Sequence, residues 1–247
     1  RKTLNYLYFN MQKKLKTSYK QEQELKILRQ IIETVSYNLD LKEVLARIIN
    51  IVAKVTKADS CFLYLLNDRE LVLSSSKNPH PKMIGKIKLK MGEGITGWVA
   101  QNQKSVVISK NAYDDERFKF FNGLPEDNYE AFLSVPIIYK DKVLGVINVQ
   151  HKKPKNYRKN EIELLEVVAK ATGGAIENAR LFTEGQVLKE ALESRKIIEK
   201  AKGILMKELN ISEEKAYKLL HKKSMDERIS MKEVARAIII SSEIKRY

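Results

Sequence analysis

The spacing of small and apolar residues near the C-terminus constrains the fold more than any other feature. Between positions 187 and 205, six such residues recur at intervals of four, three, four, three and four: Val187, Ala191, Ser194, Ile198, Ala201 and Leu205. This is the spacing of a helix face that packs along another helix. Most of the six are small or β-branched, so a partner backbone can approach closely. The pattern predicts a long helix with a packed seam.

Gly203 lies inside this predicted helix, although glycine costs a helix about 1 kcal/mol relative to alanine. Two interpretations stay open. Gly203 is either a flexible point near the helix end, or a place where a neighbouring helix or a nucleic-acid backbone passes too close for a β-carbon.

Two shorter helices are predicted after it, each with its own start signal. Ser212 can cap the first of them, with Ile211 and Ala216 as a hydrophobic staple, and Ser230 with Glu233 forms a capping box for the second. The inward faces are expected at Ala216, Leu219 and Leu220, then at Val234, Ala237, Ile238 and Ser241. The segment therefore predicts a bundle of three helices.

Three consecutive stretches, SRKIIEKAKGILM, EEKAYKLLHKKSM and ISMKEVARAII, resemble the ANTAR family of RNA-binding antiterminator domains. The resemblance covers nearly all of residues 189–243 and implies binding to paired RNA hairpins with short loops. The implied RNA-binding residues are Arg195, Lys196, Lys202, Gly203, Met206, Tyr217, His221, Lys222, Lys223, Ser224, Met225, Arg228 and Lys232. For each lysine alone, a solvated surface role is the alternative, and Tyr217 could equally belong to the core.

The net charge of +15 is compatible with a polyanionic partner, and the positive charge is densest in residues 1–26 and 189–247. A lysine-rich surface of a thermophile is the alternative explanation. A chain of 247 residues can hold one medium and one small domain. One cysteine excludes a disulfide framework, no apolar run is long enough to span a bilayer, and no signal-peptide core is present, so we expect a cytoplasmic protein.

The middle of the chain predicts a mixed fold of helices and strands. A helical seam at Leu25, Leu28, Ile32, Val35 and Leu39 precedes a second apolar helix from 44 to 52. Alternating segments then predict strands at 60–66, 70–75, 84–89, 104–108, 131–139 and 142–150, before a long amphipathic helix at 161–182. The residues themselves therefore predict one mixed α/β domain.

Three motifs in this region resemble a GAF domain, a small-molecule sensory module: MGEGITGWVAQNQKSVVI, FLSVPIIYKDKVLGVINVQHKK and NEIELLEVVAKATGGAIENARLF. The resemblance implies an α+β class, with a central antiparallel sheet flanked by helices. The expected organisation is a basic helical segment at 1–23, a GAF domain at 24–183, and a coiled-coil helix with the ANTAR domain at 184–247. The glycines at 92, 94 and 97 lack the surrounding βαβ unit of a dinucleotide site, so we expect them to form a positive-φ turn before a short helix.

The GAF resemblance implies a ligand pocket between the sheet and the segments that cover it. Its expected walls are Phe62, Tyr64, Trp98, Phe118, Phe121, Phe132, Ser134 and Asn148. The alternative is that these aromatic residues fill a core without a ligand. Cyclic-nucleotide-binding GAF domains carry an Asn-Lys pair, then a Phe, then an Asp-Glu pair after the last strand. The matching stretch here has His151-Lys152, then Tyr157, then Asn160-Glu161. This departure argues against cyclic-nucleotide binding.

No catalytic, metal or cofactor site is predicted. Cys61 fits an apolar filler better than a chromophore attachment point, and the histidines at 80, 151 and 221 are far apart. The acidic run at 114–116 is expected to start a helix.

Paired RNA hairpins and the two helical seams imply a parallel homodimer. Replacing Lys202 or Lys222 should weaken RNA binding, whereas Lys245 should matter little. Two other classes stay open. The first is a GAF-gated DNA-binding regulator with a helix-turn-helix, disfavoured because the link from Met225 to Ile229 looks too long. The second is a GAF-gated scaffold for a protein partner.

Overall fold

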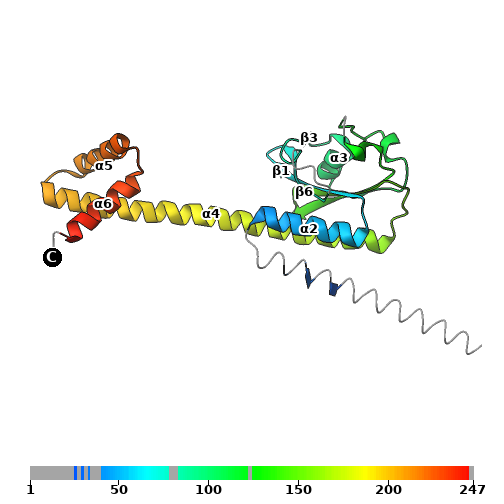
Figure 1. The fold of residues 1–247 in the computed structure, drawn as a ribbon, viewed down its shortest axis with the longest axis horizontal. Coiled ribbons are helices and arrows are strands. Elements are labelled where there is room, and N and C mark those ends of the chain that lie inside the picture. Colours follow the sequence, from blue (N-terminus) through cyan, green and yellow to red (C-terminus); the bar gives the residue numbers. More distant parts are fainter. Residues whose placement is uncertain are drawn as a thin grey trace, which may run out of the picture. The chain divides into compact units, whose positions relative to one another are not determined.

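The computed structural model describes residues 25–26, 29–30, 33, 40–77, 83–121 and 124–244 (Figure 1). Most of the predicted N-terminal seam, the prolines at 79 and 81, His80 and Lys245 lie outside the described residues. The chain divides into two compact units after Arg180, and helix α4 (Lys159–Leu209) contributes residues to both. Each unit is described by itself below.

The first unit contains a six-stranded sheet in the order β3-β2-β1-β6-β5-β4, and every neighbouring pair is antiparallel. The strands are β1 (Ser60–Asn67), β2 (Glu70–Ser76), β3 (Lys88–Lys90), β4 (Val106–Ile108), β5 (Ala131–Tyr139) and β6 (Lys142–His151). The α+β class with an antiparallel sheet is therefore confirmed. The predicted strand at 84–89 is wrong in its bounds, because residues 83–86 form a turn around Gly85, whose φ is +78°.

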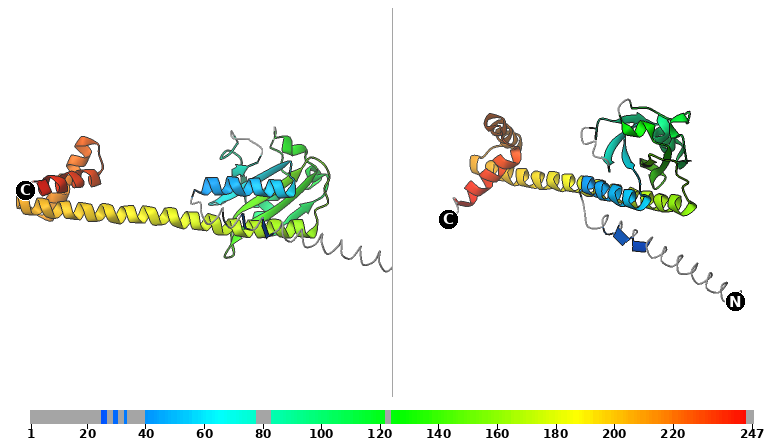
Figure 2. Two further views of the ribbon diagram at one scale, coloured as in Figure 1. Left: turned by 60° about the horizontal axis from the view of Figure 1, so that its bottom comes forward. Right: turned by 45° about the vertical axis from the view of Figure 1, so that its right-hand side comes forward.

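Helix α2 (Leu41–Thr56) and the first part of α4 cover one face of this sheet, as both views in Figure 2 show. Asp40 caps α2 by accepting a hydrogen bond from the Lys42 backbone N–H at 2.8 Å. The buried side of α2 packs on alternate residues of β1, such as Cys61 and Leu63. Burial raises the pKa of the Cys61 thiol, which keeps it protonated as an apolar filler.

The other residues of β1, including Phe62 and Tyr64, face the opposite side, where a second core forms with helix α3 (Gly94–Asn102). Gly92 and Gly94 precede and begin this helix with φ of +82° and +67°, as predicted. The prediction is wrong for Gly97, which lies inside α3 without a positive φ; glycine is needed there because a β-carbon would clash with the Lys90 carbonyl oxygen. Between β5 and β6, Lys140 and Asp141 adopt φ of +44° and +62°, which fits the predicted tight turn.

The connection from β4 to β5 crosses the α3 side of the sheet and contains two short 3-10 helices, η1 (Ala112–Asp114) and η2 (Pro125–Asn128). The expected helix start at 114–116 is wrong. A single 3-10 turn ends at Asp114, and the Asp115 carboxylate instead accepts two hydrogen bonds from the Arg117 guanidinium, each 2.8 Å long.

The second unit consists of residues 181–209 of α4, helix α5 (Glu213–Glu227) and helix α6 (Met231–Ile244). Ser212 caps α5 through Lys215, and Ser230 exchanges hydrogen bonds with Glu233 at the start of α6, so both predicted start signals are confirmed. The three-helix prediction is correct.

The core of the second unit is small and consists of Ala201, Leu220, Val234 and Ala235. The predicted inward face of α6 is partly wrong: Ala237 and Ser241 are exposed, and Ala235 and Ser242 are buried in their place. Leu219 of α5 is also exposed. The sequence pattern therefore located the helices better than it located their buried faces.

Residues 181–193 of α4 are exposed along their whole length within the second unit. The large apolar side chains among them are Leu181, Phe182, Val187, Leu188 and Leu192. Only the later part of the predicted seam, from Ile198 onward, packs against α5 and α6. Among the residues that the structure describes, no helix is both long and apolar enough to cross a membrane.

Candidate functional site

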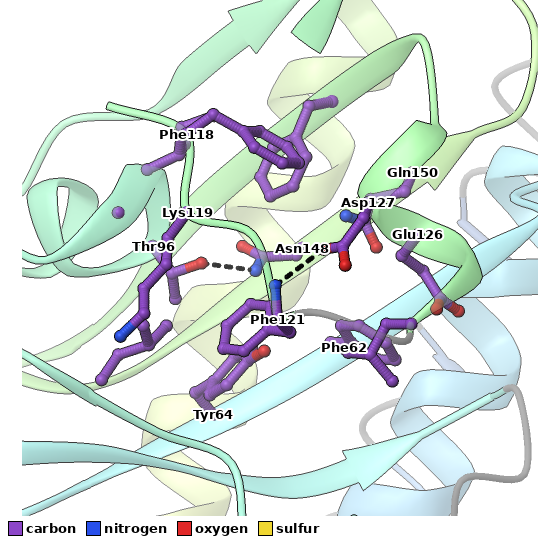
Figure 3. A pocket seen from close by; sticks show the side chains of 15 residues that line it. Phe62, Tyr64, Thr96, Phe118, Lys119, Phe121, Glu126, Asp127, Asn148 and Gln150 are labelled. Atoms are coloured by element: carbon purple, nitrogen blue, oxygen red, sulfur yellow. Dashed lines mark hydrogen bonds between the residues drawn. The ribbon is translucent and has the colours of Figure 1, made fainter. Parts of the chain in front are cut away.

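The first unit contains a cavity of about 30 Å3 between the sheet, α3 and the β4–β5 connection (Figure 3). Of the predicted pocket residues, Phe62, Tyr64, Phe118, Phe121, Phe132 and Asn148 line it. A cavity of this size has room for about one water molecule. The aromatic side chains therefore fill most of the space that the fold encloses.

Two predicted residues do not line the cavity. Trp98 lies under the Arg117 guanidinium, which is 4.8 Å from the ring centroid, and so helps to hold the β4–β5 connection in place. Ser134 is fully buried and donates a 2.7 Å hydrogen bond to the Asn148 carbonyl oxygen. The Asn148 amide in turn donates to the Thr96 hydroxyl at 2.7 Å. This buried chain fixes the orientation of Asn148 and links β5, β6 and α3.

Sequence reasoning missed five polar residues of the cavity: Thr96, Lys119, Glu126, Asp127 and Gln150. Gln150 could have been found, because it alternates with Asn148 on the same side of β6. Thr96 lies in α3, and the other three lie in an irregular connection without periodicity. Asp127 accepts a 3.0 Å hydrogen bond from the Phe121 backbone N–H, and Lys119 forms an ion pair with Glu93. These contacts close the connection over the cavity.

Burial and the nearby charge of Glu126 together raise the pKa of the Tyr64 phenol. Burial likewise raises the pKa of Tyr129, and Glu126 adds to that shift. Glu126 itself is buried beside these two rings, with only 3% of its surface exposed.

In the second unit, the arrangement around Lys202 differs from the prediction. Lys202 is buried, and its ammonium group binds the carboxylates of Glu199 at 2.8 Å and Glu213 at 2.6 Å. Hydrogen bonds from Lys202 to these two carboxylates raise its pKa. Because Glu213 belongs to α5, Lys202 attaches the first turn of α5 to α4, and its charge is not free for a phosphate in this structure.

Gly203 faces open space, since a β-carbon built on it would meet no described atom within 4 Å. No neighbouring helix of this unit therefore requires glycine here. Arg195, Lys196 and Met206 are exposed on the same side of α4. A flexible point near the helix end and a close approach from outside the unit both fit these surroundings.

On α5, Tyr217 is 47% exposed, so it belongs to the surface and not to the core. Its ring lies 6.3 Å from that of His221, with an angle of 20° between the two planes. Met225 continues this stripe at helical spacing and is 66% exposed. Lys222 is exposed beside the stripe.

The four other predicted residues lie at the end of α5 and the start of α6. Lys223 points away from His221 and pairs with Glu227 at 2.6 Å. The Ser224 hydroxyl donates to the Ile229 carbonyl at 2.6 Å, and Arg228 ends α5 in the left-handed conformation with φ of +55°. Lys232 is half-buried in the first turn of α6. The link between α5 and α6 comprises only residues 228–230, so the expected long link is wrong.

The sheet order and the helices that cover it define the first unit as a domain of the GAF fold class. The GAF domain model matches residues 38–177, more than half of the chain, and the ANTAR domain model matches residues 186–239. The protein belongs to the GAF family and carries an ANTAR domain after its GAF domain.

The solved structures support this assignment. A GAF domain from an Acinetobacter phosphoenolpyruvate-protein phosphotransferase is 30% identical, with a TM-score of 0.58, and the match covers 66% of this chain and 98% of that one.

Among curated relatives, the Nitrate regulatory protein of Klebsiella oxytoca is 50% identical over 52 residues, which cover 21% of this chain and 13% of the relative. The transcriptional regulatory protein PdtaR of Mycobacterium tuberculosis is 41% identical over 58 residues, covering 23% and 28% of the two chains. A dual cyclic-AMP and cyclic-GMP phosphodiesterase 11A of Takifugu rubripes is 25% identical over 217 residues, which cover 82% of this chain and 24% of that enzyme. The chain thus spans about a quarter, or less, of the length of these relatives.

Proposed function

We propose that this protein is a ligand-responsive transcription antitermination regulator that binds paired RNA hairpins in nascent transcripts. The observation that carries the proposal is the ANTAR match at 186–239, which falls on a three-helix unit with an exposed aromatic and basic face. The relatives matched over this region have names that denote regulatory proteins. The protein acts as a regulator in the cytoplasm, where its transcripts are made, and not as an enzyme.

The proposed RNA face is the stripe of Tyr217, His221 and Met225, joined by Lys222 on α5 and by the open side of α4 around Gly203. Paired RNA offers phosphates to lysine and arginine, and unpaired loop bases can stack on aromatic rings. The near-parallel rings of Tyr217 and His221 provide such a stacking surface. Lys202 acts differently: it positions α5 and does not contact RNA directly.

A parallel homodimer is part of the proposal, because two hairpins require two ANTAR domains. The exposed apolar side chains at 181–192 of α4 support it, since water-exposed leucine and valine along one helix favour association with a second helix. Light scattering at micromolar protein concentration should give the mass of a dimer. A monomer with and without RNA would contradict this part.

The GAF cavity is proposed to bind a small molecule that changes the relative arrangement of the helices flanking the domain. The free energy by which the ligand shifts this arrangement can be no larger than the difference in its binding free energy between the two arrangements.

DNA binding is the second candidate, because the three-residue link between α5 and α6 is typical of a helix-turn-helix. Against it, the exposed part of α6 offers Arg236 but lacks the asparagine and glutamine side chains that read base edges. A scaffold for a protein partner would bind neither nucleic acid.

A mobility-shift titration separates these candidates. The full chain should bind a two-hairpin RNA more tightly than duplex DNA of the same number of phosphates at moderate salt. Lys222→Ala tests the face, and Lys200→Ala is the matched control, because Lys200 is an exposed lysine paired with Glu243 of α6. Equal losses for the two variants would indicate diffuse electrostatic binding, and tighter binding to DNA would favour the second candidate.

A further inference from the structure

Helix α4 carries a second row of small and apolar residues, called the outer row below, that does not belong to the core of either unit. Its spacing alternates between three and four residues, which is the heptad spacing of a coiled coil. The members are Leu164, Val167, Ala171, Gly174, Asn178, Leu181, Gly185, Leu188 and Leu192. In the first unit the buried side of α4 lies elsewhere, at residues such as Leu165, Val168 and Thr172. The outer row therefore faces away from the GAF core.

The large members of the outer row are exposed to water. Val167 is 47% exposed, although the adjacent Val168 is buried. Leu181, Leu188 and Leu192 are 52% to 62% exposed. Apolar side chains at heptad positions on the surface of a helix are typical of a face that a second helix covers.

The outer row differs from the seam that the sequence predicted through Val187. That seam continues into Ile198 and Ala201, which pack against α5 and α6 within the second unit. A partner helix that followed the predicted seam would meet α5 and α6 there. The outer row ends at Leu192, because its next position is the charged Arg195. It thus stops before the part of α4 that α5 and α6 cover.

Small residues of the outer row leave room for a close neighbour. A β-carbon built on Gly174 or Gly185 would meet no described atom within 4 Å, so the fold of one chain does not require glycine at either position. Glycine nevertheless destabilises the interior of a helix relative to alanine. A second backbone that passes close to the row accounts for both glycines, since they lie in line with the exposed leucines.

Asn178, an exposed residue at the middle of the outer row, indicates the direction of the partner helix. In a parallel pair in register each position meets its own counterpart, so two Asn178 amides can hydrogen-bond to each other. In an antiparallel pair the amide would face Gly174 or Leu181 and would be buried without a partner. A single asparagine at such a position favours one register of a coiled coil.

We propose that two copies of this chain pair in parallel along the outer row of α4, from Leu164 to Leu192, with Asn178 facing its counterpart. The inference rests on the homodimer of the proposed function and identifies the surface that forms it. The row spans about four heptads, the length that a coiled-coil pattern needs to be distinctive.

Disulfide formation between single-cysteine variants of the full chain tests the proposal. Leu188 belongs to the outer row and Val187 to the predicted seam, and the two are 62% and 63% exposed, so they differ in direction and hardly in accessibility. Under mild oxidation Leu188→Cys should form an intermolecular disulfide, and Val187→Cys should not. Val167→Cys should also cross-link, because the row continues along the first unit. The native Cys61 is fully buried and does not compete.

Sedimentation equilibrium of the full chain measures the same interface without cross-linking. Leu188→Ala should raise the dissociation constant of the dimer about a hundred-fold, because two buried leucine side chains are lost from each dimer. Val187→Ala is the matched control and should change it little. Asn178→Leu should tighten association and allow larger oligomers, because the asparagine no longer selects one register. A weaker dimer in Asn178→Leu would contradict the parallel arrangement.

Cross-linking through Val187→Cys in place of Leu188→Cys, or no cross-link in Val167→Cys, would overturn the outer row and leave the homodimer itself intact. A monomer at every concentration would overturn both. RNA binding by the second unit is measured separately in the mobility-shift titration, so failure of the interface and failure of the proposed function are distinguishable.

Discussion

The two units use polar residues in opposite ways. In the GAF unit the informative polar groups, such as Asn148, Gln150 and Glu126, are buried against a large two-sided core. In the ANTAR unit a small core leaves most polar and several apolar groups on the surface. The contrast indicates a site enclosed by the fold in one unit and a site displayed on the outside in the other. Substitutions should therefore affect stability and binding together in the first unit and separately in the second.

The largest effect tests the difference between the two cores. Leu63→Ala in the GAF core should lower the free energy of unfolding by about 4 kcal/mol, because closely packed neighbours on both sides cannot collapse into the cavity. Leu220→Ala in the ANTAR core should cost about 2 to 3 kcal/mol, since the surrounding helices can shift. Calorimetry of the two variants should show each change in a different transition. A single shared transition would contradict the division into two units.

The second prediction concerns His151 in the GAF unit, which is 7% exposed. Burial, helped by the positive charge of Lys155, lowers its pKa from 6.5 to about 4. Between pH 6.5 and pH 4, His151 binds a proton in the unfolded chain but stays neutral in the folded protein. Stability is therefore retained above pH 6.5 and lost as the pH falls toward 4, by up to about 3 kcal/mol.

Denaturant unfolding as a function of pH measures this loss. His151→Gln should flatten the pH dependence in that window, because glutamine does not titrate. His221→Gln, which changes an exposed histidine of the ANTAR unit, is the control and should leave the profile unchanged. An unaltered profile in His151→Gln would show that another group causes the loss.

The third prediction concerns the external site. Tyr217→Ala should weaken binding to a two-hairpin RNA by about 1 to 3 kcal/mol, the usual loss when a base no longer stacks on an aromatic ring. Because Tyr217 is exposed, the melting temperature should hardly change. Tyr217→Phe keeps the ring and should retain most of the affinity. An equal loss in both variants would assign the effect to the hydroxyl instead.

The smallest effect concerns single lysines. Lys222→Ala should reduce the slope of log affinity against log salt by about 0.7 to 0.9, the contribution of one phosphate contact. Lys202→Met should leave that slope nearly unchanged while altering the attachment of α5 to α4. A salt slope that falls as much for Lys202→Met as for Lys222→Ala would show that Lys202 reaches the RNA after all.

Local patterns predicted much of this structure. The bounds of β5, the Lys140-Asp141 turn and the Ser230–Glu233 capping box depend on neighbouring residues, and all three are confirmed. Alternation also identified the aromatic side of the sheet that lines the cavity.

Features that depend on partners distant in sequence were not predictable. The burial of Lys202 depends on Glu213 in the next helix, and no periodicity marks such a pair. Glu126 and Asp127 reach the cavity because an irregular connection folds over it. The length of the α5–α6 link was overestimated because α5 continues to Glu227 and ends at the left-handed Arg228.

Gly203 has a consequence for the evolution of the ANTAR unit. It lies in the interior of α4 with room for a β-carbon, so Gly203→Ala should stabilise the helix by about 1 kcal/mol. A chain under selection for stability alone would acquire alanine here. If RNA must approach this backbone, the same substitution lowers affinity, and selection for folding and for recognition act in opposite directions at one residue. A library of substitutions at position 203, sorted once for protein abundance and once for RNA binding, should therefore enrich different residues at this position.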